Sequence, residues 1–207
     1  MINQHKVWGA NVAGAWSVFQ MHIRKAEITD AKAITALVNR AYRPAAGTEG
    51  WTHESALVEG DRINQSKVAT AILGGTVLVG TCEQGLMGCI HIEVADQVAH
   101  IGMLAVDPLL QNSGAGKRLL KQAEEIAVRE FNAAFAVLVV IAARKELVDY
   151  YLRRGYKQTE ERSQYPIHAG VGRPTKDAML LTTLRKPLND LFSDDQIFDA
   201  ARIQSNL

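Results

Sequence analysis

The chain has 207 residues, of which 47% are hydrophobic and 22% charged, the balance of a globular domain that buries a substantial core. Its formal net charge of +1 gives no electrostatic reason to expect nucleic acid or an anionic membrane as a partner, and no apolar run of about 18 residues predicts a membrane span. Two cysteines, Cys82 and Cys89, are too few for a disulfide framework and indicate reduced thiols in a cytoplasmic protein.

The two ends of the chain differ from its middle. Residues 1–20 are mildly apolar but make a poor signal peptide, so we expect either a leader packed on the outside or an overlong start. The compact domain is expected to begin at Met21, because residues 22–26 alternate like a first strand. We expect a C-terminal helical extension over residues 188–207, which leaves residues 21–187 as the domain.

Helical periodicity dominates the next segment. Residues 29–42 begin with the cap-like pair Thr-Asp and carry apolar residues at helical spacing. The loop 44–50 ends that helix. A second helix is predicted from Thr52, as its N-cap, to about Asp61. Residues 68–73 fit either a short helix or a strand.

Three strands then follow with short turns between them, over residues 76–82, 86–94 and 98–106. Short turns predict antiparallel neighbours. The elements predicted after them are a long helix to about residue 131, a buried strand 135–142, a helix from about Glu146 to a cap at Gly155, and strands 156–161 and 178–184.

A glycine-rich stretch, residues 111–117, joins the third strand to the long helix. The first amides of a helix lack internal partners and attract phosphate groups, and small residues at 113–116 let a diphosphate approach. A nucleoside-triphosphatase loop would need Gly at 111 and a hydroxyl residue at 118. A dinucleotide fingerprint would need a third Gly at 119, which is Leu. The remaining pattern is Gln-x-x-Gly-x-Gly after Leu-x-Val.

Three motifs in order carry a resemblance to a known family: Met-Leu-Ala-Val-Asp-Pro at 103–108, the stretch 111–116, and Tyr-Leu-Arg-Arg-Gly-Tyr at 151–156. Together with the order of elements, they resemble the GNAT N-acetyltransferase superfamily over roughly residues 21–187. The resemblance implies an α/β (α+β) fold, in which a mixed, mostly antiparallel sheet splays at the strand that binds coenzyme A. It also implies acetyl-CoA as co-substrate, and the histidines and cysteines show no ligand spacing for a metal.

The resemblance assigns residues to the binding of acetyl-CoA. The main chain of Leu104, Ala105 and Val106 would bind the pantetheine arm, although Leu104 and Val106 also suit an ordinary core. The loop residues expected to bind the diphosphate are Gln111, Asn112, Ser113, Gly114, Ala115, Gly116 and Lys117, with Lys117 or Arg118 adding charge. Arg144 stands near a position where many members have Asn; it would bind the 3′-phosphate or the diphosphate, or remain solvated.

The same resemblance points to catalytic residues. Tyr151 matches the family tyrosine near the CoA sulfur, where a phenol can donate a proton to the thiolate. The alternative is that Tyr151 only fills the core, a part that Tyr150 beside it would also suit. His100 and Glu93 are the candidates for general base, since histidine exchanges protons near neutral pH. His100 stands near the place of the family Glu, which puts a carboxylate base in doubt.

The acceptor site is expected to form from the first helices, their loop and the late strands. Tyr42, Trp51 and Glu54 are its candidates, because aromatic rings and a carboxylate suit a cationic amine. Trp51 and Glu54 would equally serve as a helix staple and a first-turn cap. The expected function is transfer of an acetyl group to a small-molecule amine or an amino terminus by direct attack on the thioester. The alternative is a non-catalytic acyl-CoA-binding module, and a homodimer is left open.

Overall fold

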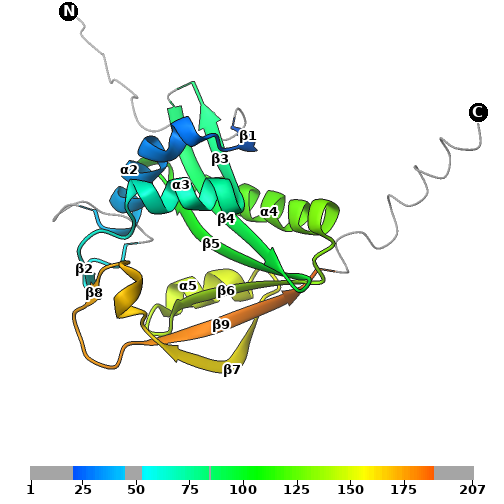
Figure 1. Cartoon of the computed structure of the whole chain (residues 1–207). Helices are drawn as coiled ribbons and strands as arrows, with labels where there is room; N and C mark the ends of the chain where they lie inside the picture. The colour runs from blue at the N-terminus through cyan, green and yellow to red at the C-terminus, as the bar shows by residue number, and fades with distance from the viewer. Residues whose placement is uncertain (1–20, 45–52, 84, 189–207) are drawn as a thin grey trace, which may run out of the picture.

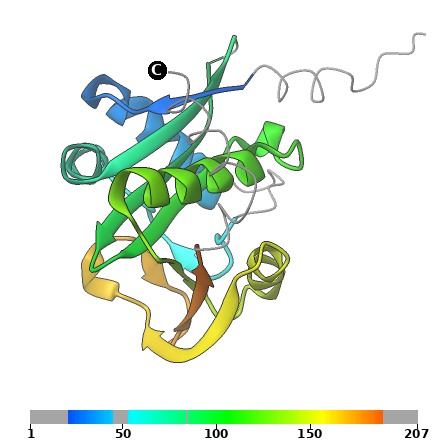
Figure 2. The same ribbon diagram turned by 90° about the vertical axis from the view of Figure 1, so that its right-hand side faces the viewer.

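The computed structural model describes residues 21–44, 53–83 and 85–188. Figures 1 and 2 show a twisted central sheet with helices on both faces, which confirms the predicted fold class. The predictions made for residues 1–20, for residues beyond 188, and for Trp51 and Thr52 lie outside the described residues. None of the helices in the described ranges is both long and apolar enough to cross a membrane.

The sheet has seven strands. In spatial order they are β1 (His22–Lys25), β3 (Thr76–Cys82), β4 (Gly85–Ala95), β5 (Val98–Val106), β6 (Phe135–Ile141), β9 (Leu180–Pro187) and β7 (Lys157–Gln164). Only β5 and β6 run parallel, and every other neighbouring pair is antiparallel. The predicted three-strand meander is therefore confirmed as β3, β4 and β5.

Helices cover the sheet on both faces. On one face lie α2 (Ala31–Tyr42) and α3 (Gln65–Gly74), and on the other lies α4 (Ala115–Phe131), while α5 (Lys145–Leu152) packs beside β7. Two clusters of buried side chains follow from this layering, since alternate strand residues point to opposite faces. The 3₁₀ turns are η1 (Ile28–Asp30), η2 (Pro108–Leu110) and η3 (Ile167–Ala169).

The predicted helix over residues 52–61 is wrong in its described part. Residues 55–57 form a turn, and Val58–Glu59 form strand β2, which pairs with β8 (Arg173–Pro174) more than 100 residues later in the chain. Helix α3 begins later, where the Asn64 side chain accepts a hydrogen bond from the Lys67 amide at 3.0 Å. The pairing of β2 with β8 is a long-range contact, so local periodicity could not reveal it.

The strands β5 and β6 pair only at their beginnings, from Val98 opposite Phe135 to His100 opposite Val137. Beyond His100 the two strands separate. Strand β5 also contains a bulge. Cys89 of β4 pairs with Ala105 and His91 with Gly102, so a step of two residues on β4 corresponds to three residues on β5. Met103, within this step, has a positive φ of 51°. The separation leaves the second half of β5 without a strand partner on the β6 side, and that half faces the candidate site.

Candidate functional site

The glycine-rich loop turns sharply before α4. Asn112 and Gly114 have φ values of 63° and 91°, and Gly114 is the N-cap of α4 without a side chain that caps the helix. The first amides of α4 are therefore not covered by a capping side chain, as an anion site requires. The Ser113 hydroxyl donates to the Leu110 carbonyl, which holds the loop itself.

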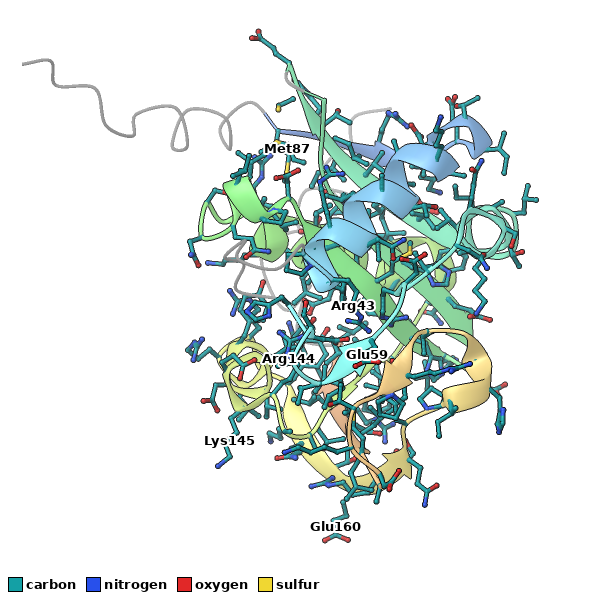
Figure 3. All side chains as sticks on the ribbon, turned by 90° about the vertical axis from the view of Figure 1, so that its left-hand side faces the viewer. Arg43, Glu59, Met87, Arg144, Lys145 and Glu160 are labelled. Atoms are coloured by element: carbon teal, nitrogen blue, oxygen red, sulfur yellow. The ribbon has the colours of Figure 1, made fainter. Side chains whose placement is uncertain are left out.

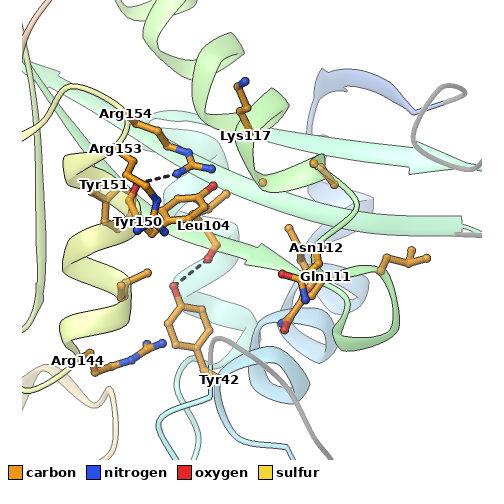
Figure 4. A pocket seen from close by; sticks show the side chains of 16 residues that line it. Tyr42, Leu104, Gln111, Asn112, Lys117, Arg144, Tyr150, Tyr151, Arg153 and Arg154 are labelled. Atoms are coloured by element: carbon orange, nitrogen blue, oxygen red, sulfur yellow. Dashed lines mark hydrogen bonds between the residues drawn. The ribbon is translucent and has the colours of Figure 1, made fainter. Parts of the chain in front are cut away.

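A cavity of about 360 Å³ opens between this loop, the separated half of β5, and α5. Figure 4 shows its wall, with Tyr42 and Arg144 at one end and Lys117 at the other. The predicted site residues that line it are Tyr42, Leu104, Val106, Gln111, Asn112, Gly114, Ala115, Gly116, Lys117, Arg144 and Tyr151. Ala105 belongs to the core beneath α2 on the opposite face of β5, and Ser113 is not part of the wall.

Gly116 allows α4 and α5 to approach each other across the cavity. A Cβ atom at this position would lie 3.2 Å from the Tyr150 hydroxyl and 3.5 Å from Val106 Cγ2. Tyr150, considered above as a core residue, thus contributes to the cavity wall together with Tyr151. The guanidinium carbon of Arg154 lies 3.3 Å from the centre of the Tyr150 ring, a cation–π contact that holds the ring in place.

Tyr151 is buried, with 6% of its surface exposed. Its ring meets Tyr150 and Tyr156 edge to face, at centroid distances of 5.1 Å and 5.7 Å. Burial raises the pKa of Tyr151 well above that of a free phenol, so the hydroxyl stays protonated at neutral pH. The side chain is held in place as a hydrogen-bond donor at the cavity wall.

Two carbonyl groups of β5 receive side-chain hydrogen bonds. The Tyr42 hydroxyl donates to the Leu104 oxygen at 2.9 Å, and Gln111 Nε2 donates to the Val106 oxygen at 3.3 Å. Burial raises the pKa of Tyr42 to about 12, so this donor also stays protonated. Each carbonyl oxygen has two lone pairs, so one acceptor position remains on Leu104 and on Val106 for a ligand that lies along β5.

The two candidate bases lie outside the cavity wall. Glu93 and His100 face each other on β4 and β5, and both are exposed. Their neighbours Ile92, Ala99 and Ile101 belong to the core under α4, so alternation turns Glu93 and His100 toward the α2 and α3 face. The described part of the wall contains neither a carboxylate nor an imidazole. A role for either residue as a base remains a prediction.

Glu54 is buried but does not line the cavity. Arg43 Nη1 donates to one of its oxygens at 2.8 Å, and Arg144 Nη1 donates to the other at 3.3 Å. Figure 3 shows both arginines between the α2 side of the molecule and the β7–β9 side. The sequence had suggested that Glu54 binds a cationic amine. Because two guanidinium groups already engage its carboxylate, Glu54 is poorly placed for that role.

Several residues of the cavity wall were not expected from the sequence, namely Leu110, Leu147, Tyr150, Arg153 and Arg154. The two arginines belong to the motif at 151–156, and the end of α5 places them in the cavity wall together with residues of the loop. Arg118, considered above as an alternative to Lys117, donates to the Met21 carbonyl at 3.0 Å. Within the described ranges, no group of three or more His, Cys, Asp or Glu side chains could hold a metal ion.

Comparisons with known proteins agree with this geometry. A family model described as "Acetyltransferase (GNAT) domain" matches residues 52–166. The ribosomal-protein-S18-alanine N-acetyltransferase from Escherichia coli is similar in fold, with a TM-score of 0.61 and 17% identity over 85% of this chain and 97% of that chain. The comparison with curated proteins finds no match.

Two further similar structures were determined with the coenzyme. The putative acetyltransferase yncA from Salmonella typhimurium, with its cofactor acetyl-CoA, has a TM-score of 0.58 and 22% identity over 85% of this chain and 98% of that chain. PaiA N-acetyltransferase from Thermoplasma acidophilum, in complex with coenzyme A, has a TM-score of 0.59 and 18% identity over 81% of this chain and 98% of that chain. At these identities the likeness establishes the shared fold.

Proposed function

The chain belongs to the GNAT acetyltransferase family, and we propose that it is an acetyl-CoA-dependent N-acetyltransferase acting on a primary amine. One observation carries the proposal. A single cavity joins the uncapped N-terminus of α4 to the buried hydroxyl-bearing ring of Tyr151, and it runs along the half of β5 that has separated from β6. We propose residues 21–187 as the catalytic domain.

The residues at the loop end of the cavity fit a diphosphate. The amides at the start of α4 are accompanied by three cationic side chains of the wall, those of Lys117, Arg153 and Arg154. Arg154 Nε is buried and has no hydrogen-bond partner among the described residues, which fits a ligand that supplies an acceptor. The remaining lone pairs on the Leu104 and Val106 carbonyls fit the amide N–H groups of the pantetheine arm.

Acetyl-CoA supplies an activated thioester, and transfer forms a nitrogen–carbon bond while the carbon–sulfur bond breaks. The amine nitrogen releases a proton to water, and the sulfur departs as a thiolate that takes up a proton from water. Tyr151 is proposed to donate its hydrogen bond to that sulfur. Burial makes the phenol a weaker acid but keeps its proton in place, so its contribution is the stabilisation of the developing thiolate. His100 or Glu93 is proposed to accept the amine proton through water.

The test measures release of free CoA thiol from acetyl-CoA with a panel of primary amines. For the best acceptor, Tyr151→Phe is expected to lower kcat about 10- to 100-fold and to leave the KM for acetyl-CoA close to that of the wild type, because one hydrogen bond to a charged group is lost. Tyr165→Phe is the matched control, since Tyr165 is buried but does not line the cavity.

Two results would contradict the proposal. Unchanged kcat in Tyr151→Phe would exclude a role for this hydroxyl in the transfer. No thiol release with any amine, combined with tight CoA binding, would favour the non-catalytic acyl-CoA-binding module instead.

A further inference from the structure

Arg144 is a buried cation with an unused hydrogen-bond donor. Only 3% of the residue is exposed. Its Nη1 donates to Glu54 Oε1 at 3.3 Å, and its Nε donates to Glu146 Oε1 at 3.2 Å. Its Nη2 is buried and has no hydrogen-bond partner among the residues that the structure describes. Buried donors in proteins are almost always satisfied, so an unsatisfied guanidinium nitrogen at a cavity wall indicates that a ligand supplies the acceptor.

Arg144 lies at the end of the cavity away from the phosphate-binding loop. In Figure 4 its guanidinium points toward Tyr42, while Lys117 and Asn112 lie on other sides of the cavity, away from Arg144. The Tyr42 hydroxyl in turn bonds Leu104, in the half of β5 that has separated from β6. If acetyl-CoA binds as proposed above, with its diphosphate at α4, this end receives the acceptor.

The charges around Arg144 favour an anion. Glu54 is shared between Arg43 and Arg144, and the side chains of Arg43 and Glu54 are each only 9% exposed. This buried group of two cations and one anion carries an excess positive charge. The guanidinium of Arg62 lies 5.3 Å from the centre of the Tyr42 ring and adds another. The carboxylate of Glu146 is half exposed, so water screens it.

We propose that the acceptor is a primary amine that also carries a carboxylate group, and that Arg144 binds this carboxylate through Nη2. The inference rests on the proposed function. A guanidinium matches a carboxylate in shape and charge, whereas a polyamine would bring positive charge to a positive site. The same positive charge disfavours an ammonium ion, so it helps to keep the attacking amine neutral in a cavity whose described wall offers neither a carboxylate nor an imidazole as a base.

The first experiment compares matched acceptors with the wild-type protein at saturating acetyl-CoA. Each set contains an α-amino acid, its carboxamide and the decarboxylated amine, and thiol release gives kcat/KM. We expect kcat/KM to fall about 10- to 100-fold from acid to carboxamide, as for loss of one charged hydrogen bond. Equal rates within the sets would overturn the proposal. So would a preference for aminophosphonates, which would assign the site to phosphate groups.

The second experiment places the effect on Arg144. In Arg144→Gln the acid-to-carboxamide ratio is expected to fall to near one, while the KM for acetyl-CoA remains unchanged. Arg129→Gln, an exposed position on α4, is the matched control. A raised KM for acetyl-CoA with an unchanged acceptor ratio would assign Arg144 to the coenzyme, as the sequence predicts, and overturn the proposal. If urea titrations show that Arg144→Gln does not fold, the comparison of matched acceptors with the wild-type protein tests the proposal by itself.

Failure of this inference can be told apart from failure of the proposed function. If no amine releases thiol, the proposed function fails. Carboxylate binding is then measured by calorimetric titration of the same acids and carboxamides into protein saturated with CoA. Affinity at least about 10-fold higher for the acid supports the Arg144 site, and equal affinity overturns it.

Discussion

A buried carboxylate connects the two halves of the split sheet. Glu124 lies on α4 and is 3% exposed. The Tyr156 hydroxyl donates to its Oε1 at 2.8 Å, and Lys186 Nζ lies 2.6 Å from its Oε2. Tyr156 follows α5 and Lys186 belongs to β9, so both partners come from the half of the molecule beyond the separation of β5 and β6. The network therefore holds α4 against that half.

Replacing the cation tests how much this network stabilises the fold. Lys186→Met leaves the Glu124 carboxylate buried with only the Tyr156 hydroxyl, and breaking a buried ion pair costs about 3–5 kcal/mol. The Lys186 side chain is 17% exposed, which admits some water, so we expect the lower end, about 3 kcal/mol. For a chain of this size that loss lowers the Tm by roughly 6–12 °C.

Urea unfolding of single and double variants measures the effect. We expect Glu124→Gln combined with Lys186→Met to recover much of the stability that Lys186→Met loses, because no unpaired charge remains buried. Lys25→Met is the matched control: Lys25 pairs with Glu130 at 2.5 Å on the surface, and its loss is expected to cost less than about 1 kcal/mol. If Lys186→Met also loses less than about 1 kcal/mol, the buried ion pair does not stabilise the fold as expected.

Three further predictions concern local features. Gly114→Ala is expected to destabilise the fold by about 1–2 kcal/mol, since its φ is 91°, and to raise the KM for acetyl-CoA; an unchanged KM would separate the loop from the coenzyme site. Burial raises the pKa of Cys89 to about 12, so iodoacetamide at pH 8 should label Cys82 before Cys89. Mass spectrometry measures the labelling, and equal labelling of the two cysteines would contradict this prediction. Burial lowers the pKa of His91 below its ordinary value of 6.5, so the unfolded chain takes up the proton first and the free energy of unfolding falls as pH drops below about 6.5. In urea titrations, His91→Gln should flatten this pH dependence. An unchanged slope would exclude His91 as its cause.

The sequence by itself determined most of the layer order and the glycine-rich loop before α4. The meander β3–β5 and the helices α2, α4 and α5 depend on periodicity and turn residues within a few positions, which are local signals. The loop before α4 was legible for the same reason, because Gly114 and its neighbours lie between a strand and a helix in the sequence itself. The motif at 151–156 likewise located Tyr151, which the structure buries at the cavity wall.

Only the tertiary structure decided the surroundings of Arg144, the end of the cavity proposed to receive the acceptor. Glu54 was predicted in a helix that would bind an amine, yet it lies in a turn region and pairs with Arg43 and Arg144, which is 90 residues away in the sequence. The family resemblance implied that the sheet splays at β5, but only the structure places the separation of β5 and β6 after His100. No local pattern showed that Glu93 and His100 lie outside the cavity wall. Loops and partner residues distant in sequence meet here through the packing of α2 against β5 and the pairing of β2 with β8. The charge of this end is a sum over residues from several elements, and that sum exists only once the chain has folded.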